Sequence, residues 1–492
     1  MLPILRPPVE SPEVAALEEI LQSRDLAIAI QGPAGAGKTT FAAEEVRAIE
    51  ALSGKDVMVL APSSSAVNEL RSRVTPKAET IQQFMINPEL QDAARGGVLR
   101  IDEASFLSAR AGRWLLEFAR DSGTRLVVPG DVRQHHSVER GDWLRVMEQT
   151  GAICYAAITK IFRQQIAPLR DAVRDLSQGK IEEGLDKLEK FGAICQVEDK
   201  TERLAKIAEL HLAALKERKS SLIVAPTHGE CRTICGAVRE AMKGEGMLSG
   251  PEQTVPRLNR LNLTEAQRGD AVSYEPGYVV EFHRIVKGAA VGGRKEKRFR
   301  SGEQWTVVRR DPGGGVLVER EGVQKFLPLE HSGKFDLYRP EQIALAAGDT
   351  VCITKNFCVA GTRFRNNEFH RVAAVDAQTI TFDGGSRIEA GSRFLHIDQG
   401  VAVTSYARQS RTIDQVIASA PVESFSQVNR AQFYVTMSRA RQAMHLFTDS
   451  KAALREAACR PSERLSSIEI GSENEIDDLL TRLQRSARAG RR

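Results

Sequence analysis

A glycine-rich segment near the start of the sequence carries the clearest chemical signal. The segment GPAGAGKT (32–39) fits the spacing G-x-x-x-x-G-K-[ST], follows an apolar run and precedes a sequence that can continue as a helix. Glycines let backbone N–H groups curl around phosphate oxygens, while the lysine ammonium binds the outer phosphates and the threonine hydroxyl is a ligand for Mg²⁺. The alternative is a glycine-rich turn that matches by chance. We therefore predict a site for ATP and Mg²⁺, and the expected nucleotide-binding residues are Gly32, Gly35, Gly37, Lys38, Thr39 and Thr40.

Two more groups of polar side chains follow apolar runs farther along the chain. Asp102 and Glu103 come directly after VLRI, where an aspartate can complete a Mg²⁺ shell with Thr39 and a glutamate can activate a water molecule. Gln134 follows RLVVPGD, where its amide can sense the outermost phosphate. Taken alone, such residues at strand ends are usually caps or turns. Together with the glycine-rich segment they indicate triphosphate hydrolysis, with Lys38, Glu103 and Gln134 as catalytic residues and Thr39 and Asp102 as metal ligands.

These side chains need a scaffold that brings strand ends together. Short apolar runs alternate with helix-like segments through the first third of the chain, and each run ends at Gly, Pro or Asp. This pattern predicts a doubly wound α/β domain over residues 1–165, whose ligands lie beyond the carboxyl ends of its parallel strands. The four expected strands are LAIAIQ (26–31), DVMVLAP (56–62), VLRID (98–102) and RLVVPGD (125–131).

The rest of the sequence predicts a second α/β domain that is interrupted by a β-rich insertion. A helical connector and the start of the second domain are expected over 166–264, with SLIVAPT (221–227) as its first strand. Residues 265–395 contain short β-rich runs separated by Gly, Asp and Asn, which predict a small β-barrel. The second domain is expected to resume over 396–455, and residues 456–492 are typical of a helical tail.

Composition narrows the class of protein. The chain has 492 residues, 42% of them hydrophobic, and no apolar run near the roughly 20 residues that span a bilayer. Seven scattered cysteines form no C-x-x-C pair, so neither zinc nor disulfides are expected. Because no signal peptide is evident, we predict a cytoplasmic protein without a membrane partner. Net charge is only +5, but GRKEKRFR (293–300) and TRLQRSARAGRR (481–492) are basic clusters that either contact phosphates or are simply solvated.

The order of nine segments resembles superfamily 1 helicases of the 5′-to-3′ class. The resemblance is closest to the motor half of conjugative relaxase–helicases of the TraI/TrwC type, with RecD-like motors next. It implies two RecA-like lobes, an SH3-like barrel inserted in the second lobe, and ATP-driven 5′-to-3′ movement on single-stranded DNA. The segments, in chain order, are IQGPAGAGKTT, LAPSSSAVNEL, AETIQQF, RIDEAS, VPGDVRQHHSVERGDWLR, IFRQQ, LIVAPTHGE, AVTSYARQSRTID and FYVTMSRARQAMHLFT.

The resemblance also assigns roles to residues to which the local sequence pattern gives none. It implies that Arg163 and Arg439 reach the outermost phosphate from the second lobe, and a guanidinium suits this task because it stays charged and donates in a planar fork. Without the surrounding motifs, both would be read as ordinary surface arginines. The resemblance further implies a nucleic-acid face, whose expected contact residues are Ser63, Thr80, Thr227, Thr404, Tyr406 and Arg408.

Three departures from the family pattern bear on function. Glu13 stands where the family usually has a glutamine that pairs with adenine, and a carboxylate accepts from the base but does not donate to it. The segment Thr404–Ser410 lacks the usual His, Lys and Gly, and Arg408 stands one place along from the missing charge, which predicts an altered grip on the strand. Little sequence separates AETIQQF from RIDEAS, which leaves small room for a strand-separating pin.

The expected function is therefore a DNA motor that works with a partner. The first histidine is His135, so the His triad of a nicking domain is not expected, and we predict a separate protein that recruits the motor to DNA. Two alternatives remain at this stage. One is an ATP-regulated nucleic-acid-binding scaffold or loader without processive unwinding, and the other is an ATP-dependent switch that grips duplex DNA.

Overall fold

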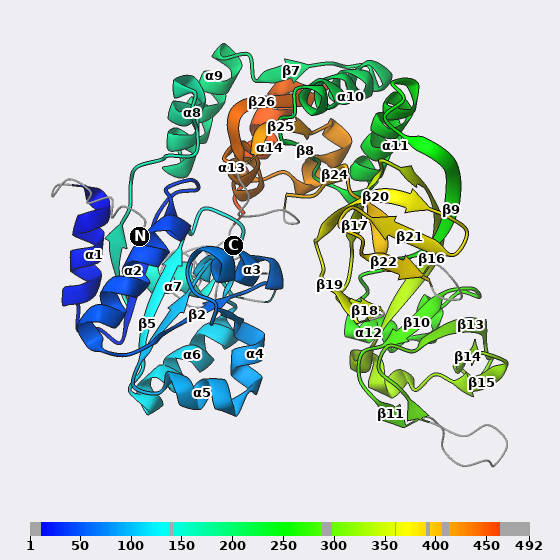
Figure 1. Ribbon diagram of the computed structural model, residues 1–492, viewed down its shortest axis with the longest axis horizontal. Helices are drawn as coiled ribbons and strands as arrows, with labels where there is room; N and C mark the ends of the chain where they lie inside the picture. The colour runs from blue at the N-terminus through cyan, green and yellow to red at the C-terminus, as the bar shows by residue number, and fades with distance from the viewer. Residues whose placement is uncertain are drawn as a thin grey trace, which may run out of the picture. The chain divides into compact units, whose positions relative to one another are not determined.

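The computed structural model describes residues 11–137, 139, 141–287, 298–359, 361–389, 394–405 and 413–462. The chain divides into two compact units, one formed by Met1–Ala241 with Ala402–Arg492 and the other by Met242–Val401 (Figure 1). Within the described ranges, no helix combines the length and apolarity needed to cross a bilayer.

The first lobe of the discontinuous unit is a wholly parallel six-stranded sheet in the order β3-β2-β4-β5-β1-β6. Four of its strands confirm the predicted apolar runs. The strands are β1 (Ala27–Gln31), β2 (Val57–Ala61), β3 (Glu79–Thr80), β4 (Val98–Ile101), β5 (Arg125–Gly130) and β6 (Cys154–Ala157). The helices are α1 (Pro12–Gln22), α2 (Lys38–Ser53), α3 (Ser64–Arg73), α4 (Ile81–Ile86), α5 (Pro88–Ala94), α6 (Ala109–Ser122) and α7 (Trp143–Gln149), and the 3₁₀ turn η1 spans Ala104–Phe106.

Both faces of this sheet are covered, which explains why its strands read as continuous apolar runs. Ile28 and Ile30 of β1 pack in one hydrophobic cluster with residues of α1, α2 and α3. Ala27 and Ala29 of the same strand point to the other face, where they pack with residues of α4, α6 and α7. The predicted doubly wound arrangement is therefore confirmed, and the carboxyl ends of β1, β4 and β5 lie along one edge.

The second lobe is a parallel five-stranded sheet in the order β24-β8-β25-β26-β7. Its strands are β7 (Ile194–Gln196), β8 (Ser221–Val224), β24 (Ala402–Val403), β25 (Ile413–Ser419) and β26 (Ala440–Thr448). Its helices are α8 (Ala167–Ser177), α9 (Ile181–Lys190), α10 (Lys200–Lys216), α11 (His228–Gly244), α13 (Arg430–Met437) and α14 (Lys451–Ala458), and the 3₁₀ turn η4 spans Val422–Gln427. The predicted helical tail coincides with α14 only at its start, and residues 463–492 lie outside the described residues.

The second unit is almost entirely antiparallel β-structure and interrupts the second lobe, as the sequence predicted. One sheet has the order β15-β14-β13-β10-β16-β9, another has the order β22-β21-β20-β17-β23, and the hairpins β11–β12 and β18–β19 complete the unit. The first sheet consists of β9 (Ser249–Arg260), β10 (Val279–Phe282), β13 (Gln304–Arg310), β14 (Val316–Arg320), β15 (Val323–Phe326) and β16 (Phe335–Ala347). The second consists of β17 (Thr350–Ile353), β20 (Phe369–Val375), β21 (Thr379–Phe382), β22 (Arg387–Glu389) and β23 (Ile397–Gln399).

Several short elements complete this unit. They are the hairpin strands β11 (Val286–Lys287), β12 (Arg298–Phe299), β18 (Phe357–Val359) and β19 (Thr362–Phe364), the helix α12 (Glu265–Arg268), and the 3₁₀ turns η2 (Ala271–Ser273) and η3 (Leu329–Lys334). The unit begins at Met242, ahead of the predicted residue 265, because the long strand β9 pairs with β16 and so belongs to the insertion. The unit has two hydrophobic clusters, one of which joins the second sheet to residues of β9 and β16, and this is more than the single small barrel that the sequence suggested. An SH3-like assignment of either sheet remains a prediction.

A buried charge network lies in this unit. Glu281 of β10 accepts hydrogen bonds from His396 Nε2 at 2.6 Å and from Lys355 Nζ at 2.8 Å. Burial disfavours the Glu281 carboxylate, but His396 and Lys355 outweigh it and lower the pKa of Glu281 to about 2. The network therefore adds pH-dependent stability to the second unit.

Candidate functional site

The phosphate-binding loop lies between β1 and α2, as its sequence predicted. Gly35 and Gly37 have φ angles of +82° and +77°, a left-handed conformation that side chains rarely adopt. A Cβ atom added to Gly35 would lie 2.6 Å from Cβ of Arg163, so both conformation and space require glycine there. The carbonyl of Gly35 accepts hydrogen bonds from the amides of Phe162 at 2.9 Å and Arg163 at 3.2 Å. The loop is therefore packed against the segment that carries Arg163.

Lys38 is the first residue of α2 and lies in the centre of the site. Its ammonium donates hydrogen bonds to the carbonyls of Gly32 and Pro33 within the loop. Burial lowers the pKa of Lys38, while Asp131, Asp102 and Glu103 oppose this shift and Arg163 adds to it. The three carboxylates keep the ammonium charged, and a buried ammonium beside curled backbone amides is suited to phosphate oxygens.

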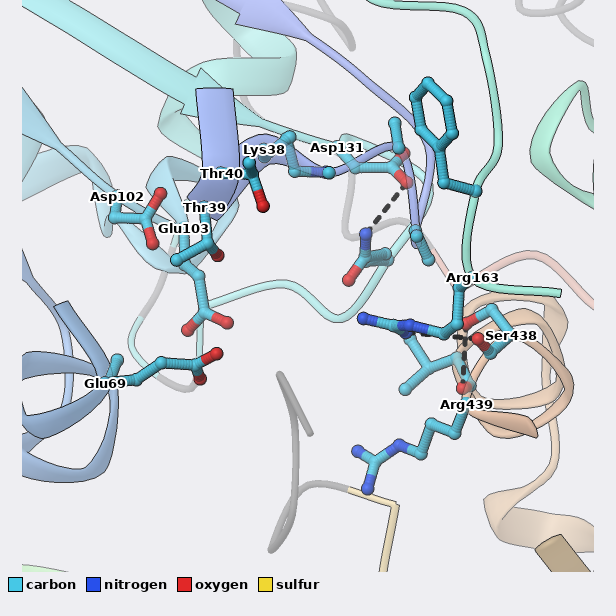
Figure 2. A pocket seen from close by; sticks show the side chains of 18 of the residues that line it. Lys38, Thr39, Thr40, Glu69, Asp102, Glu103, Asp131, Arg163, Ser438 and Arg439 are labelled. Carbon is cyan, nitrogen blue, oxygen red and sulfur yellow. Dashed lines mark hydrogen bonds between the residues drawn. The ribbon is translucent and has the colours of Figure 1, made fainter. Parts of the chain in front are cut away.

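The acidic pair follows β4, as predicted. The Asp102 amide donates to the Leu60 carbonyl at 2.8 Å, which fixes the carboxylate at the carboxyl edge of the sheet. Glu103 has a φ of +50°, an unusual conformation for a residue with a side chain and one that is common at functional sites. Figure 2 shows the carboxylates of Asp102 and Glu103 on the side of Thr39. Glu69 of α3 also lines this pocket and was not predicted from the sequence.

Arg100 holds Asp102 from within the sheet. Its side chain has no exposed surface, and it donates to Asp102 Oδ1 at 3.0 Å and to Glu45 Oε2 of α2 at 3.1 Å. Glu45 is equally buried. Sequence reasoning missed this triad, although a charged residue within the apolar run VLRI was a visible signal, because buried charges are almost always paired.

Gln134 lies beyond β5, where its amide donates to Asp131 Oδ2 at 2.9 Å. The other Asp131 oxygen accepts the backbone amide of Arg133 at 3.1 Å. Tyr434 of α13 also reaches this aspartate and donates to Oδ2 at 2.9 Å. Asp131 and Tyr434 were not among the predicted site residues.

Two predicted arginines line the site from the connector and the second lobe. Arg163 donates through Nη1 to the Ser438 carbonyl at 3.1 Å, and burial lowers the pKa of Arg163 although Tyr434 and Glu69 favour its charge. Arg439 follows α13 and donates to the Ser405 carbonyl. Figure 2 shows both arginines across the pocket from Asp102 and Glu103.

His135 connects the first lobe to the same serine. Its Nε2 lies 3.0 Å from Ser405 Oγ, and burial, with help from Arg439 and His136, lowers the pKa of His135 to about 3. The imidazole is therefore neutral at ordinary pH. It joins the end of β5 to the segment that follows β24.

The phosphate loop, the acidic pair, Gln134 and the two arginines line a pocket of about 350 Å³. Most of the predicted residues for nucleotide chemistry line it, together with the ring of Phe162, which is 52% exposed. Gly32 accepts a hydrogen bond from Lys38 through its carbonyl, whereas Glu13 lies in the first turn of α1 and is not among the residues that line the pocket. The predicted residues that the structure brings together here are Gly35, Gly37, Lys38, Thr39, Thr40, Asp102, Glu103, Gln134, Arg163 and Arg439.

Three of the residues predicted for nucleic acid occupy helix starts, Thr404 follows a strand, and two lie outside the described residues. The hydroxyl oxygens of Ser63, Thr80 and Thr227 accept backbone amides at 3.1–3.2 Å, as N-caps do. Capping uses an oxygen lone pair and leaves the hydroxyl proton available to donate to a phosphate. Thr404 follows β24 and is partly buried, whereas Tyr406, Arg408 and most of the basic run 293–300 lie outside the described residues.

The two parallel sheets, the glycine loop and the acidic pair define a two-lobed P-loop NTPase. Residues 12–199 match the family model described as an AAA domain. The chain is 24% identical to the multifunctional conjugation protein TraI of Escherichia coli over 90% of its own length and 27% of the relative. It is 26% identical to the probable conjugal transfer protein TraA of Sinorhizobium fredii over 47% of its length and 21% of the relative.

The chain thus spans about a quarter of the length of the curated relatives it matches. Among solved structures, the Pif1 helicase from Candida albicans is 15% identical with a TM-score of 0.45, and covers 92% of this chain and 96% of its own. The comparisons confirm the resemblance to superfamily 1 helicases of the TraI type that the order of motifs predicted.

Proposed function

We propose that this protein is an ATP-driven motor that moves 5′-to-3′ along single-stranded DNA. The observation that carries the proposal is the composition of the pocket. The phosphate loop and acidic pair come from the first lobe, while Arg439 comes from the second lobe and Arg163 from the segment that leads into it. Hydrolysis in such a pocket changes what the arginines bind, and so couples ATP turnover to movement of the lobes.

Each side chain has a specific task in this proposal. Lys38 binds the outer phosphates, Glu103 orients and deprotonates the attacking water, and Gln134 contacts the outermost phosphate. Arg163 and Arg439 stabilise the negative charge of the transferred phosphoryl group.

Mg²⁺ fits the donor set of the pocket. Thr39 and Asp102 line the pocket beside Lys38, and their hard oxygen atoms are the ligands that Mg²⁺ prefers. When bound, the ion would neutralise phosphate charge. Arg100 keeps Asp102 in place, so the carboxylate is oriented independently of the nucleotide.

The base of ATP has one candidate contact in the pocket. Phe162 offers an exposed ring next to Gly37, and aromatic rings of this kind stack on nucleobases. Glu13 remains a proposed contact of the base. Its carboxylate would accept a hydrogen bond from an amino group of the base.

DNA contacts are proposed for Ser63, Thr80, Thr227 and Thr404, with Tyr406 and Arg408 as further contacts. Hydroxyl groups at helix starts donate to phosphates without reading sequence. Movement in the 5′-to-3′ direction on single strands is supported by the family resemblance. The relative TraI is a multifunctional conjugation protein, and we further propose that this motor serves a DNA-targeting or nicking partner.

One observation favours a second candidate, an ATP-regulated scaffold or loader without processive unwinding. The guanidinium of Arg439 donates to the Ser405 carbonyl, a group of its own lobe. A protein that keeps this contact would bind ATP and DNA without rapid turnover.

ATPase measurements with and without a single-stranded oligonucleotide separate the two candidates. The motor requires turnover that rises with DNA, and Lys38→Ala lowers it about 100-fold or more, since removing one donor to transition-state charge has effects of this size. Lys77→Ala is a matched control, because Lys77 is an exposed lysine of the same lobe that pairs with surface Asp56. A rate of ATP hydrolysis that does not rise with DNA refutes the motor. Forked duplexes with a 5′ or a 3′ overhang then fix the direction.

A further inference from the structure

Tyr434 connects the second lobe to two functional parts of the first. It lies in α13, and its side chain is only 1% exposed. The phenol oxygen accepts the Ala34 amide of the phosphate loop at 2.7 Å. Its proton is donated to Asp131 Oδ2 at 2.9 Å. One hydroxyl thus bridges a loop 400 residues away in sequence and a carboxylate 303 residues away.

Both partners of the hydroxyl belong to the proposed phosphate chemistry. Ala34 is in the glycine loop, and its amide direction is part of the loop geometry. Asp131 Oδ2 also accepts Gln134 Nε2 at 2.9 Å, so Tyr434 and Gln134 share one oxygen atom. A change in the position of the hydroxyl therefore alters both the loop and the amide that faces the outermost phosphate.

The segment that follows Tyr434 carries the arginine contacts. The Ser438 carbonyl accepts Arg163 Nη1 at 3.1 Å and Gln164 Nε2 at 2.8 Å, and Arg439 is the next residue. A packed helix moves as a rigid body. A shift of α13 therefore displaces the Tyr434 hydroxyl and the arginine contacts together.

We propose that Tyr434 is a positioning residue that transmits the position of the second lobe to the phosphate loop and to Gln134, an inference that rests on the proposed ATPase function. The hydroxyl does not contact the reacting atoms. It acts through Ala34 and Asp131, and it makes phosphate-site geometry depend on how the second lobe is placed. Burial and the neighbouring Asp131 raise the pKa of Tyr434 well above its usual value, so the phenol stays a donor.

Tyr434→Phe removes only the hydroxyl and keeps the packed ring. Tyr274→Phe is the matched control, because Tyr274 is fully buried in the other unit and donates to a single carbonyl, that of Arg268, at 2.5 Å. Two readouts are needed, namely hydrogen–deuterium exchange of the peptide that contains Ala34, and kcat and KM for ATP with a single-stranded oligonucleotide.

We expect Tyr434→Phe to speed exchange of the Ala34 amide about tenfold and to lower kcat about tenfold. The reason is that the lost hydrogen bond is to the charged Asp131 carboxylate, and hydrogen bonds to charged groups are stronger than those between neutral groups. KM changes less than about threefold, because Lys38 and the loop amides still bind phosphates. A purely structural hydroxyl would lower the melting temperature and leave kcat of the folded protein unchanged, and that result overturns the proposal.

A second variant keeps the test decisive if Tyr434→Phe folds poorly. Asp131→Asn weakens the same bridge from the other side. If the bridge is the cause, the double variant loses no more kcat than the more impaired single variant, whereas multiplied losses overturn the proposal. A wild-type protein without ATPase activity refutes the motor, and exchange at Ala34 then decides by itself whether the hydroxyl controls the loop.

Discussion

Arg100→Met tests whether the buried triad supports the site from within the sheet. Arg100 and Glu45 have no exposed side-chain surface, and Asp102 is 12% exposed. Methionine fills a similar volume and keeps the apolar character of β4, so the substitution removes charge more than packing. It leaves two carboxylates, one of them wholly buried, without their shared cation.

The size of the effect follows from this burial. Breaking a buried ion pair by removing one partner costs about 3–5 kcal/mol, because the remaining charge is uncompensated. In a domain of this size each kcal/mol lowers the melting temperature by about 2–4 °C, so the first lobe should melt roughly 6–20 °C lower. Glu45→Gln in the same chain removes the buried carboxylate and should recover more than half of the loss.

Differential scanning calorimetry of wild type, both single variants and the double variant measures this cycle directly. Arg113→Met, which removes an arginine with an 80% exposed side chain from α6, is the control and should shift melting by about 2 °C or less. If Arg100→Met lowers the melting temperature no more than the control does, the buried triad contributes none of the stability assigned to it.

Three further predictions concern the loop and the titrating groups. Gly35→Ala forces a Cβ to within 2.6 Å of Arg163 at a φ of +82°, so we expect nucleotide affinity, measured with a fluorescent ATP analogue, to fall at least about tenfold; unchanged affinity would contradict the loop geometry. Glu281 has a folded pKa of about 2, below its unfolded value, so its stabilisation of about 3 kcal/mol is present above pH 4.5 and is lost as pH falls toward 2. Urea unfolding of the second unit should show this slope, and Glu281→Gln should flatten it. His135 has a folded pKa of about 3, so protonation favours the unfolded chain below pH 6.5 and the first unit loses stability as pH falls from 6.5 toward 3. His135→Gln should reduce that loss in urea midpoints, and an equal loss in the variant would argue against a buried neutral imidazole.

The parts of the site that the sequence predicted are those built from local chain geometry. The glycine loop, Asp102, Glu103 and Gln134 each follow a strand directly, and the carboxyl ends of parallel strands meet at one sheet edge. Spacing in the sequence was therefore enough to place them. Arg163 and Arg439 came from the family resemblance, and the structure brings both to the same pocket.

Contacts between distant segments could not be read from spacing. Tyr434 sits in an apolar run, FYVTM, and nothing local distinguishes it from a core tyrosine. Its hydroxyl partners, Ala34 and Asp131, lie in the other lobe. The partner of Arg100 was similarly hidden, because Glu45 lies in α2, far from Arg100 in the sequence.

The start of the insertion was missed for a different reason. Pro251 and Pro256 lie within β9, and proline argues against a central strand. In the structure β9 is the last strand of its sheet, where it pairs with β16 and forms an isolated bridge to Leu395 on its other side, so a missing N–H is tolerated there. The segment's own sequence therefore indicated a connector, because whether a strand lies at the edge of a sheet depends on strands elsewhere in the chain.

The interrupted second lobe has a consequence for biosynthesis. β8 is made before the insertion, whereas both strands that flank it, β24 and β25, are made after residue 401. While the ribosome adds the intervening residues, Leu222, Ile223 and Val224 have neither of their final hydrogen-bonding neighbours, and an unpaired apolar strand is a template for aggregation. The nascent chain must therefore shield this strand, through α10 or a chaperone, until its late partners emerge.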